Sequence, residues 1–112
     1  MKLLINHNGQ YLTGSAIADA VMSYALTLTR SGDVDSVDLP FRATDGAIKR
    51  VVLMLGWQVE TTTVSGDDDS DELLEPGTVD SIRVRDHSRG TMRATVVDLG
   101  DHRQLQWSNF DL

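Results

Sequence analysis

The chain has 112 residues, a formal net charge of −7 and no cysteine. This length fits a single domain, residues 1–112, which can bury a core without a metal or a disulfide. The lack of cysteine excludes disulfides, thiolate catalysis and cysteine-based zinc sites, and it fits a reducing, cytoplasmic environment. No apolar run approaches the roughly 18 residues that a membrane-spanning helix needs, so we expect no membrane contact. The excess of arginine over lysine suggests a bacterial coding sequence.

The negative charge is concentrated in one short segment. Residues 67–75 carry six acidic residues and no basic one, whereas residues 1–66 and 76–112 have net charges of −1 and 0. No extended basic surface is left to attract phosphate groups, so we expect no nucleic-acid binding. Glycines bound the segment 66–77, and its like charges repel one another, which predicts an acidic mobile loop.

The first part of the chain predicts a short strand and a long helix. Leu3–Asn6 is the expected strand. The helix follows, with Thr13 or Ser15 as its cap and Gly32 as its end. Apolar residues cover more than half of its circumference, so we expect it to be buried in a curved sheet or shared with a second subunit. The helical stripe consists of Ile17, Val21, Tyr24, Ala25 and Leu28.

The stretch Val34–Leu55 predicts a β-hairpin. An alternating run and a nearly continuous apolar run flank Asp45 and Gly46, and an Asp-Gly pair is a strong signal for a tight turn. An alternative is a helix over residues 47–56 with Thr44 as its cap. The hairpin is favoured because its turn needs glycine, whereas glycine near a helix start is unfavourable.

The two strands of this hairpin should differ in environment. Pro40 cannot donate a ladder hydrogen bond, so the first strand is either an edge strand or one whose Pro40 nitrogen faces away from its partner. Val51–Leu55 is apolar on both faces, which predicts a central strand with a layer over each side. The buried face of the first strand should comprise Val37, Leu39 and Phe41.

The remainder of the chain predicts further strands. Trp57–Val64 alternates, and Val79–Arg85 and Thr91–Leu99 alternate on either side of a turn. Leu105 and Trp107 should close the chain on a final short strand. The predicted fold class is therefore α+β, with one long N-terminal helix packed on a mainly antiparallel sheet of about six or seven strands.

The acidic segment contains a partial calcium-binding pattern. Asp67, Asp69 and Asp71 stand at alternate positions, which is how a calcium loop begins. The pattern fails afterwards, because Glu72 stands where glycine is needed and Thr78 where a bidentate glutamate is needed. We interpret the segment as a solvated loop without a metal.

The histidines do not form a local metal motif, because they are too far apart in sequence. One of them follows a strand directly, where catalytic groups often lie, but a structural role is commoner there. We therefore predict no catalytic, cofactor-binding or metal-binding residue and no cofactor. The three histidines are His7, His87 and His102.

Arginines recur in the C-terminal third, where we expect them on neighbouring strands. They could bind an anion or an acidic partner, but a solvated face of an edge hairpin is the better interpretation. The two tryptophans, Trp57 and Trp107, should fill the core. The arginines are Arg83, Arg85, Arg89 and Arg93.

Three hypotheses for function follow. The first is a non-catalytic association or regulatory module that contacts an unidentified protein partner or forms a homodimer, through the helix or the edge of the central hairpin. The second is a small-molecule-binding domain or enzyme with a pocket between helix and sheet, lined by Tyr24, Trp57 and a histidine. The third is an acidic decoy that acts through residues 67–75. The first is favoured, because the sequence shows surplus apolar surface and no catalytic motif.

Overall fold

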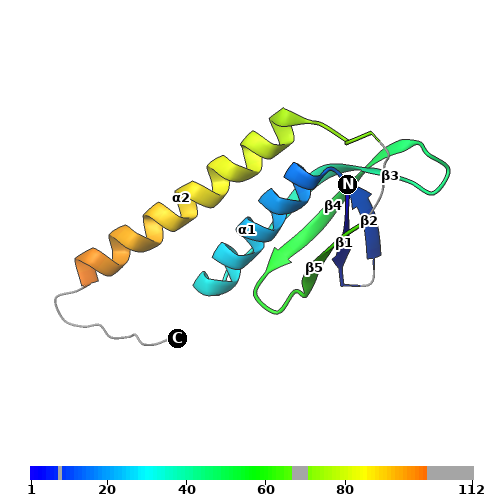
Figure 1. Ribbon diagram of the computed structural model, residues 1–112. Coiled ribbons are helices and arrows are strands. Elements are labelled where there is room, and N and C mark those ends of the chain that lie inside the picture. Colours follow the sequence, from blue (N-terminus) through cyan, green and yellow to red (C-terminus); the bar gives the residue numbers. More distant parts are fainter. Residues whose placement is uncertain (8, 67–70, 101–112) are drawn as a thin grey trace.

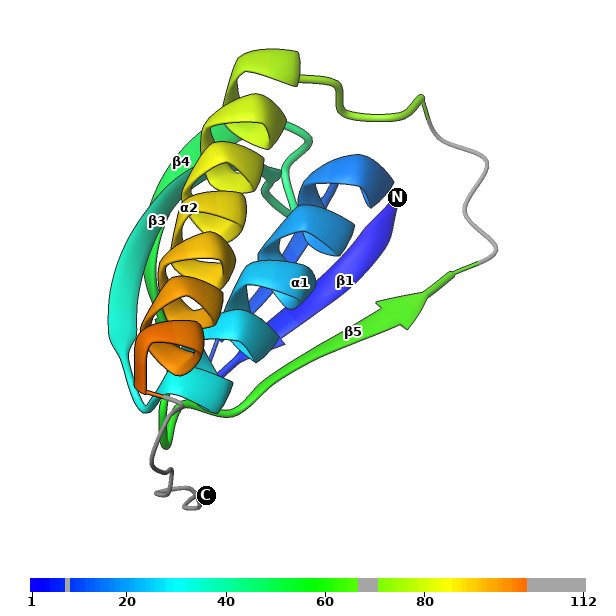
Figure 2. The ribbon, with the colours of Figure 1, turned by 90° about the vertical axis from the view of Figure 1, so that its left-hand side faces the viewer.

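The computed structural model describes residues 1–7, 9–66 and 71–100. Its strands form one antiparallel sheet in the order β4-β3-β2-β1-β5. Both helices lie on the same face of this sheet, side by side (Figures 1 and 2). The elements are β1 (Lys2–Asn6), β2 (Gly9–Thr13), α1 (Ser15–Ser31), β3 (Val34–Arg42), β4 (Ile48–Gly56), β5 (Thr61–Ser65) and α2 (Pro76–Gly100).

The α+β class with an antiparallel sheet is confirmed, but two details of the prediction are wrong. Within the described residues the sheet has five strands and not six or seven, and there is a second long helix besides the N-terminal one. None of the helices within the described residues is long and apolar enough to cross a membrane.

Strand β1 forms the middle of a three-stranded unit. It pairs with β2 from Lys2 opposite Thr13 to Asn6 opposite Gly9, and with β5 on its other side. The predicted strand at the N-terminus is therefore confirmed. We missed β2 and expected only a helix cap at its end, because five residues between two tight connections show little alternation.

Helix α1 is capped by a side chain from a distant segment. Its N-cap residue is Gly14, which offers no side-chain hydrogen bond, so the expected cap at Thr13 or Ser15 is wrong. The backbone N–H of Ser15 instead donates to the Glu72 carboxylate at 2.8 Å. A carboxylate suits this place because a helix N-terminus carries exposed N–H groups and partial positive charge.

The predicted apolar stripe of α1 is confirmed, and all five of its residues are buried. Gly32 ends the helix in the left-handed conformation, as expected, with φ of 70°. The stripe packs on the inner faces of β1, β3 and β4. The buried core cluster comprises Leu4, Ile17, Ala20, Val21, Tyr24, Ala25, Leu28, Val37, Leu39, Leu53, Leu55 and Ile82.

The central hairpin is confirmed, and the alternative helix over residues 47–56 is wrong. The turn contains Gly46 at φ of 87°, a value that favours glycine. Contrary to prediction, the second strand is not central. β4 lies at an end of the sheet order, and its outer face is exposed, with relative accessibilities of 64% for Val52 and 50% for Met54.

Pro40 marks the orientation of β3. Its carbonyl oxygen accepts a hydrogen bond from the Thr13 hydroxyl at 2.8 Å, so it points away from β4. The N and O atoms of a strand residue point to the same side, and the Pro40 nitrogen therefore faces away from its partner strand as well. This confirms the second of the two alternatives drawn from the sequence.

Helix α2 replaces the predicted strands over Val79–Arg85 and Thr91–Leu99. Pro76 occupies its first position, where a missing N–H is tolerated. The Glu75 carbonyl accepts hydrogen bonds from the N–H groups of Thr78 and Val79, which closes the first turn. The final strand predicted at residues 105–107 lies outside the described residues.

Candidate functional site

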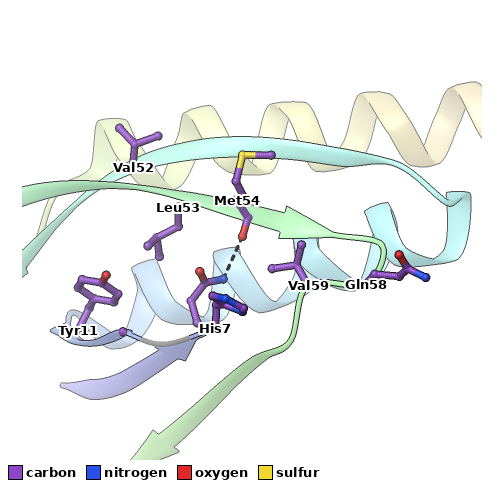
Figure 3. Close-up of a pocket in the computed structure, with 9 residues that line it drawn as sticks. His7, Tyr11, Val52, Leu53, Met54, Gln58 and Val59 are labelled. Atoms are coloured by element: carbon purple, nitrogen blue, oxygen red, sulfur yellow. Dashed lines mark hydrogen bonds between the residues drawn. The ribbon is translucent and has the colours of Figure 1, made fainter.

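A groove opens where the sheet divides. The hairpin β3–β4 shares a single residue pair with β2, Leu12 opposite Arg42, and diverges from the other strands beyond it. The resulting groove has a volume of about 480 Å³. Figure 3 shows β4 along one side, the β1–β2 connection along the other and α1 behind. The lining residues are Asn6, His7, Gly9, Tyr11, Val52, Leu53, Met54, Gln58 and Val59.

Among the described residues, those that line the groove include no acidic, lysine or arginine side chain. Besides apolar side chains, the lining contains side chains that can form neutral hydrogen bonds. One of these, Asn6, joins the two sides, because its amide donates to the Met54 carbonyl at 2.9 Å. An uncharged ligand with hydrogen-bonding groups fits this lining better than an ion does, since an unpaired charge would lose hydration there.

Two residues at the groove have an unusual backbone conformation. His7 and Gln58 have φ of 54° and 64°, and within the described part of the chain they are the non-glycine residues with positive φ. Such conformations are unfavourable for residues with a side chain and concentrate at functional sites. The His7 N–H donates to the Glu60 carbonyl at 3.1 Å, which ties the two connections together. No sequence pattern signals this arrangement.

The free edge of β4 faces this groove. Pro40 faces away from β4, so the pair of Pro40 and Arg50 forms no ladder hydrogen bonds. Hydrogen-bonded and non-hydrogen-bonded pairs alternate along an antiparallel ladder. Val52 lies two residues after Arg50, so its pair with β3 is also without ladder hydrogen bonds. The bond from Asn6 to the Met54 carbonyl fits this alternation. The N–H and C=O of Val52 therefore point away from β3, and no described residue bonds to them.

The side chains on the outer face of β4 are largely apolar. Ile48 is 50% exposed, and Val52 and Met54 continue the same alternating face. Arg50 lies among them but is paired with the carboxylates of Asp38 at 2.8 Å and Glu75 at 2.9 Å. A long apolar edge strand with unpaired backbone groups is a surface that other strands readily join.

The predicted arginine face has a different role in the structure. Arg85 donates to the Asp35 carboxylate at 2.8 Å, and Arg89 pairs with Asp33 at 3.1 Å. Both ion pairs hold α2 against the start of β3. Arg83 is exposed on α2, and the side chain of Arg93 is outside the described part.

A buried phenol shares the Asp35 carboxylate. The Tyr24 hydroxyl donates to it at 2.5 Å, and the Arg85 guanidinium lies 5.5 Å from the centre of the Tyr24 ring. Burial, together with the neighbouring carboxylate, raises the pKa of Tyr24. Burial opposes ionisation of Asp35, but hydrogen bonds from Tyr24 and the Ser36 N–H outweigh it, and the pKa of Asp35 is lowered. These groups connect α1, β3 and α2.

The histidines are not brought together in the described residues. His7 lies at the groove, His87 is exposed on α2, and His102 is outside the described part. Residues 1–7, 9–66 and 71–100 contain no group of three or more histidine, aspartate or glutamate side chains arranged for a metal ion. Tyr24 is fully buried, so it does not line the groove.

Two further predictions concern the tryptophans and the acidic segment. Trp57 is 51% exposed, so its expected core position is wrong, while Trp107 is outside the described residues. Asp67 and Asp69 also lie outside the described residues, and Asp71 is exposed.

The acidic residue Glu72 binds the N-terminal amine at 2.9 Å besides capping α1. Together these bonds hold the pKa of Glu72 below its usual range.

Comparison with known proteins adds no assignment. No protein-family model, curated protein or solved structure matches this chain. The function is therefore argued from the groove and from the edge of β4.

Proposed function

We propose that the protein is a non-catalytic association module that forms a homodimer, in which an extended segment of a second copy joins the free edge of β4. The observation that carries this proposal is Val52. Its side chain is 64% exposed, and its backbone N–H and C=O lack a described partner. Main-chain pairing at a sheet edge is a common mode of protein recognition.

Several features of the hairpin support this mode of binding. Each new backbone hydrogen bond contributes about 0.5–1.5 kcal/mol net. The exposed apolar side chains of Ile48, Val52 and Met54 would add burial along the same strand. Arg50 is held by two carboxylates and does not block the strand.

Association can be measured by sedimentation across a concentration series. We expect the wild type to dimerise and Val52→Lys to weaken the dimer at least tenfold, because the lysine charge would have to be desolvated. The matched control is Thr62→Lys, the same charge on the exposed face of β5, at the other end of the sheet. A wild type that stays monomeric at high concentration contradicts the proposal.

A second candidate function is binding of an uncharged small molecule in the groove. The strained backbone at His7 and Gln58 favours it, as does a volume of about 480 Å³, which lies within the usual range of ligand pockets. A thermal-shift screen with uncharged metabolites tests this candidate. Stabilisation of the wild type that is lost in Tyr11→Ala would support it, and a flat response would count against it.

A further inference from the structure

The unpaired edge of β4 lies in the half of the strand next to the hairpin turn. Pro40 faces away from β4, so the backbone groups of its partner Arg50 point away from β3. By the same alternation the backbone groups of Ile48 and Val52 point away from β3 as well. No described residue bonds to these groups. The unpaired edge ends at Val52, because the Met54 carbonyl already accepts a side-chain hydrogen bond.

Hydrogen bonds at both ends of the hairpin agree with this alternation. At the turn, the Ala43 N–H donates to the Ala47 carbonyl at 2.8 Å. At the other end, the Ser36 carbonyl accepts from Arg85 of α2 at 3.0 Å, so it points away from β4. The odd-numbered residues of β4 therefore bond to β3, and the backbone groups of the even-numbered ones face outward.

This half of the hairpin is accessible to another chain. Residues 44–50 are all exposed, and Figure 1 shows the turn projecting from the rest of the fold. The side chains of Ile48 and Val52 lie on one face of β4 and are 50% and 64% exposed. The edge thus presents two apolar side chains, one on either side of Arg50.

The arginine at the centre of this edge is neutralised. Arg50 pairs with Asp38 at 2.8 Å and with Glu75 at 2.9 Å. Asp38 belongs to β3, and Glu75 directly precedes α2, which contacts β3. Both carboxylates therefore draw the guanidinium toward β3 and away from the free edge. Where two such edges meet, each arginine brings two carboxylates with it, so the charges do not oppose the contact.

We infer that β4 of a second copy joins this edge as an antiparallel strand, with the two-fold axis at Arg50; this rests on the proposed homodimer. Within the described residues, the two outer strands of the sheet are β4 and β5. A contact from β4 to β5 of the next copy would leave one free edge at each end, and such contacts continue into a fibre unless they close into a ring. A two-fold contact between like edges closes at the dimer.

The two-fold axis and the free residues fix the register. Opposed residues of an antiparallel pair share a face of the sheet, so even-numbered residues of β4 stand opposite even-numbered ones. With the axis at Arg50, Ile48 stands opposite the partner's Val52, and the free residues of both copies are all paired. An axis at Val52 would place Arg50 opposite the partner's Met54, whose carbonyl is occupied. An axis at Val51 has the same fault for Ile48. The register at Arg50 forms about six backbone hydrogen bonds and two apolar cross-strand contacts.

Disulfide formation in the full chain tests this register, because the chain has no cysteine of its own. Lys49 and the partner's Val51 form a pair without ladder hydrogen bonds, in which the Cα atoms lie about 4.5 Å apart, within reach of a disulfide. Copies with Lys49→Cys are mixed with copies with Val51→Cys under mild oxidation, and mass spectrometry identifies the mixed dimer. We expect this dimer to form at least tenfold faster than in the matched control, Thr62→Cys mixed with Val64→Cys, which are exposed positions two residues apart on β5.

Val51→Cys by itself is a second control. In the proposed register its two copies lie diagonally, with Cα atoms about 7–8 Å apart, beyond the usual reach of a disulfide. We therefore expect Val51→Cys to cross-link to itself more slowly than to Lys49→Cys. Faster self-linkage would place the axis at Val51 and overturn the register.

A charge exchange tests the same register without cysteine. Ile48→Lys should weaken the dimer at least tenfold, and Val52→Glu should do the same, because each buries an unpaired charge. In the double variant the introduced charges face each other on both sides of the two-fold axis, so it should dimerise more tightly than either single variant. If the double variant is the weakest of the three, Ile48 and Val52 do not face each other and the register is wrong.

The outcomes separate this inference from the proposed function. A dimer by sedimentation whose mixed disulfide forms no faster than that of the β5 control overturns the inference, and it leaves the proposed homodimer standing with another segment at the edge. A wild type that stays monomeric overturns both.

Discussion

The two helices lie side by side on one face of the sheet, yet they are held there in different ways. Helix α1 buries seven residues, namely the five of its apolar stripe together with Ala18 and Ala20. In the described part of α2 only Thr78 and Ile82 are buried. Val79 is partly buried against the core, and the other contacts are mainly polar. The Asp86 carboxylate accepts hydrogen bonds from the hydroxyls of Ser23 and Thr27. Apolar packing therefore holds α1, whereas α2 depends more on hydrogen bonds and ion pairs.

This difference has consequences for stability. Apolar burial does not respond to pH, so the attachment of α1 should survive acid. The contacts of α2 involve ionised carboxylates and arginines, whose interactions weaken when the acids are protonated. We expect α2 to open at lower free energy than α1, as elements with few buried apolar contacts do.

The largest expected effect is on α1. Leu28 is fully buried, and Leu28→Ala should reduce the free energy of unfolding by about 3 kcal/mol because it leaves a cavity in the core. Urea unfolding followed by circular dichroism measures this change. Leu26→Ala on the exposed side of the same helix is the control and should change stability by less than about 1 kcal/mol. Equal losses in the two variants would contradict the packing described for α1.

An intermediate effect is expected on α2. Ile82 is the one described apolar residue of α2 that is fully buried, so Ile82→Ala should cost about 2 kcal/mol, at the low end of the range for such a change. Hydrogen exchange should show loss of protection in α2 while α1 and the sheet keep theirs. Val84→Ala, exposed on the same helix, is the control and should leave exchange unchanged. Uniform loss of protection across the fold would show that α2 is not a separate unit.

The same difference explains what the sequence could predict. The stripe of α1 recurs at helical spacing, and the hairpin has both its alternation and its Asp-Gly turn, so both were found. In α2 the apolar residues Val79, Ile82 and Val84 fit a strand nearly as well as a helix. The signal that favours a helix is Pro76, because proline is common at a first helical position; the prediction followed the alternating pattern and did not use Pro76.

The site was harder to predict than the fold. Val52 and Met54 are apolar, and a continuous apolar run usually indicates burial on both faces. Their exposure follows from the placement of both helices on the opposite face of the sheet, over Leu53 and Leu55. Likewise, the conformations of His7 and Gln58 follow from tight connections between strands. Such long-range geometry leaves no local pattern in the sequence.

The smallest expected effect concerns the polar contacts between the helices and β3. Asp35→Asn should cost about 1 kcal/mol at neutral pH, because it weakens the bonds to Tyr24 and Arg85. The pKa of Asp35 is lowered in the folded protein, so its stabilising contribution is present above the ordinary value near 3.8 and is lost as the pH falls through the lowered value. Urea unfolding at pH 7, 5 and 3 should therefore show the wild type and Asp35→Asn converging only in acid.

The matched control for this measurement is Asp19→Asn on the exposed side of α1. Asp19 pairs with Lys2 at 2.6 Å but does not contact α2. Its removal should leave the pH profile close to that of the wild type, because an exposed ion pair contributes little. If Asp35→Asn keeps the full acid sensitivity of the wild type, the carboxylate of Asp35 is not what couples α2 to pH. The coupling would then have to come from another carboxylate, such as Asp33, which pairs with Arg89 of α2, or Asp86, which belongs to α2 and accepts hydrogen bonds from α1.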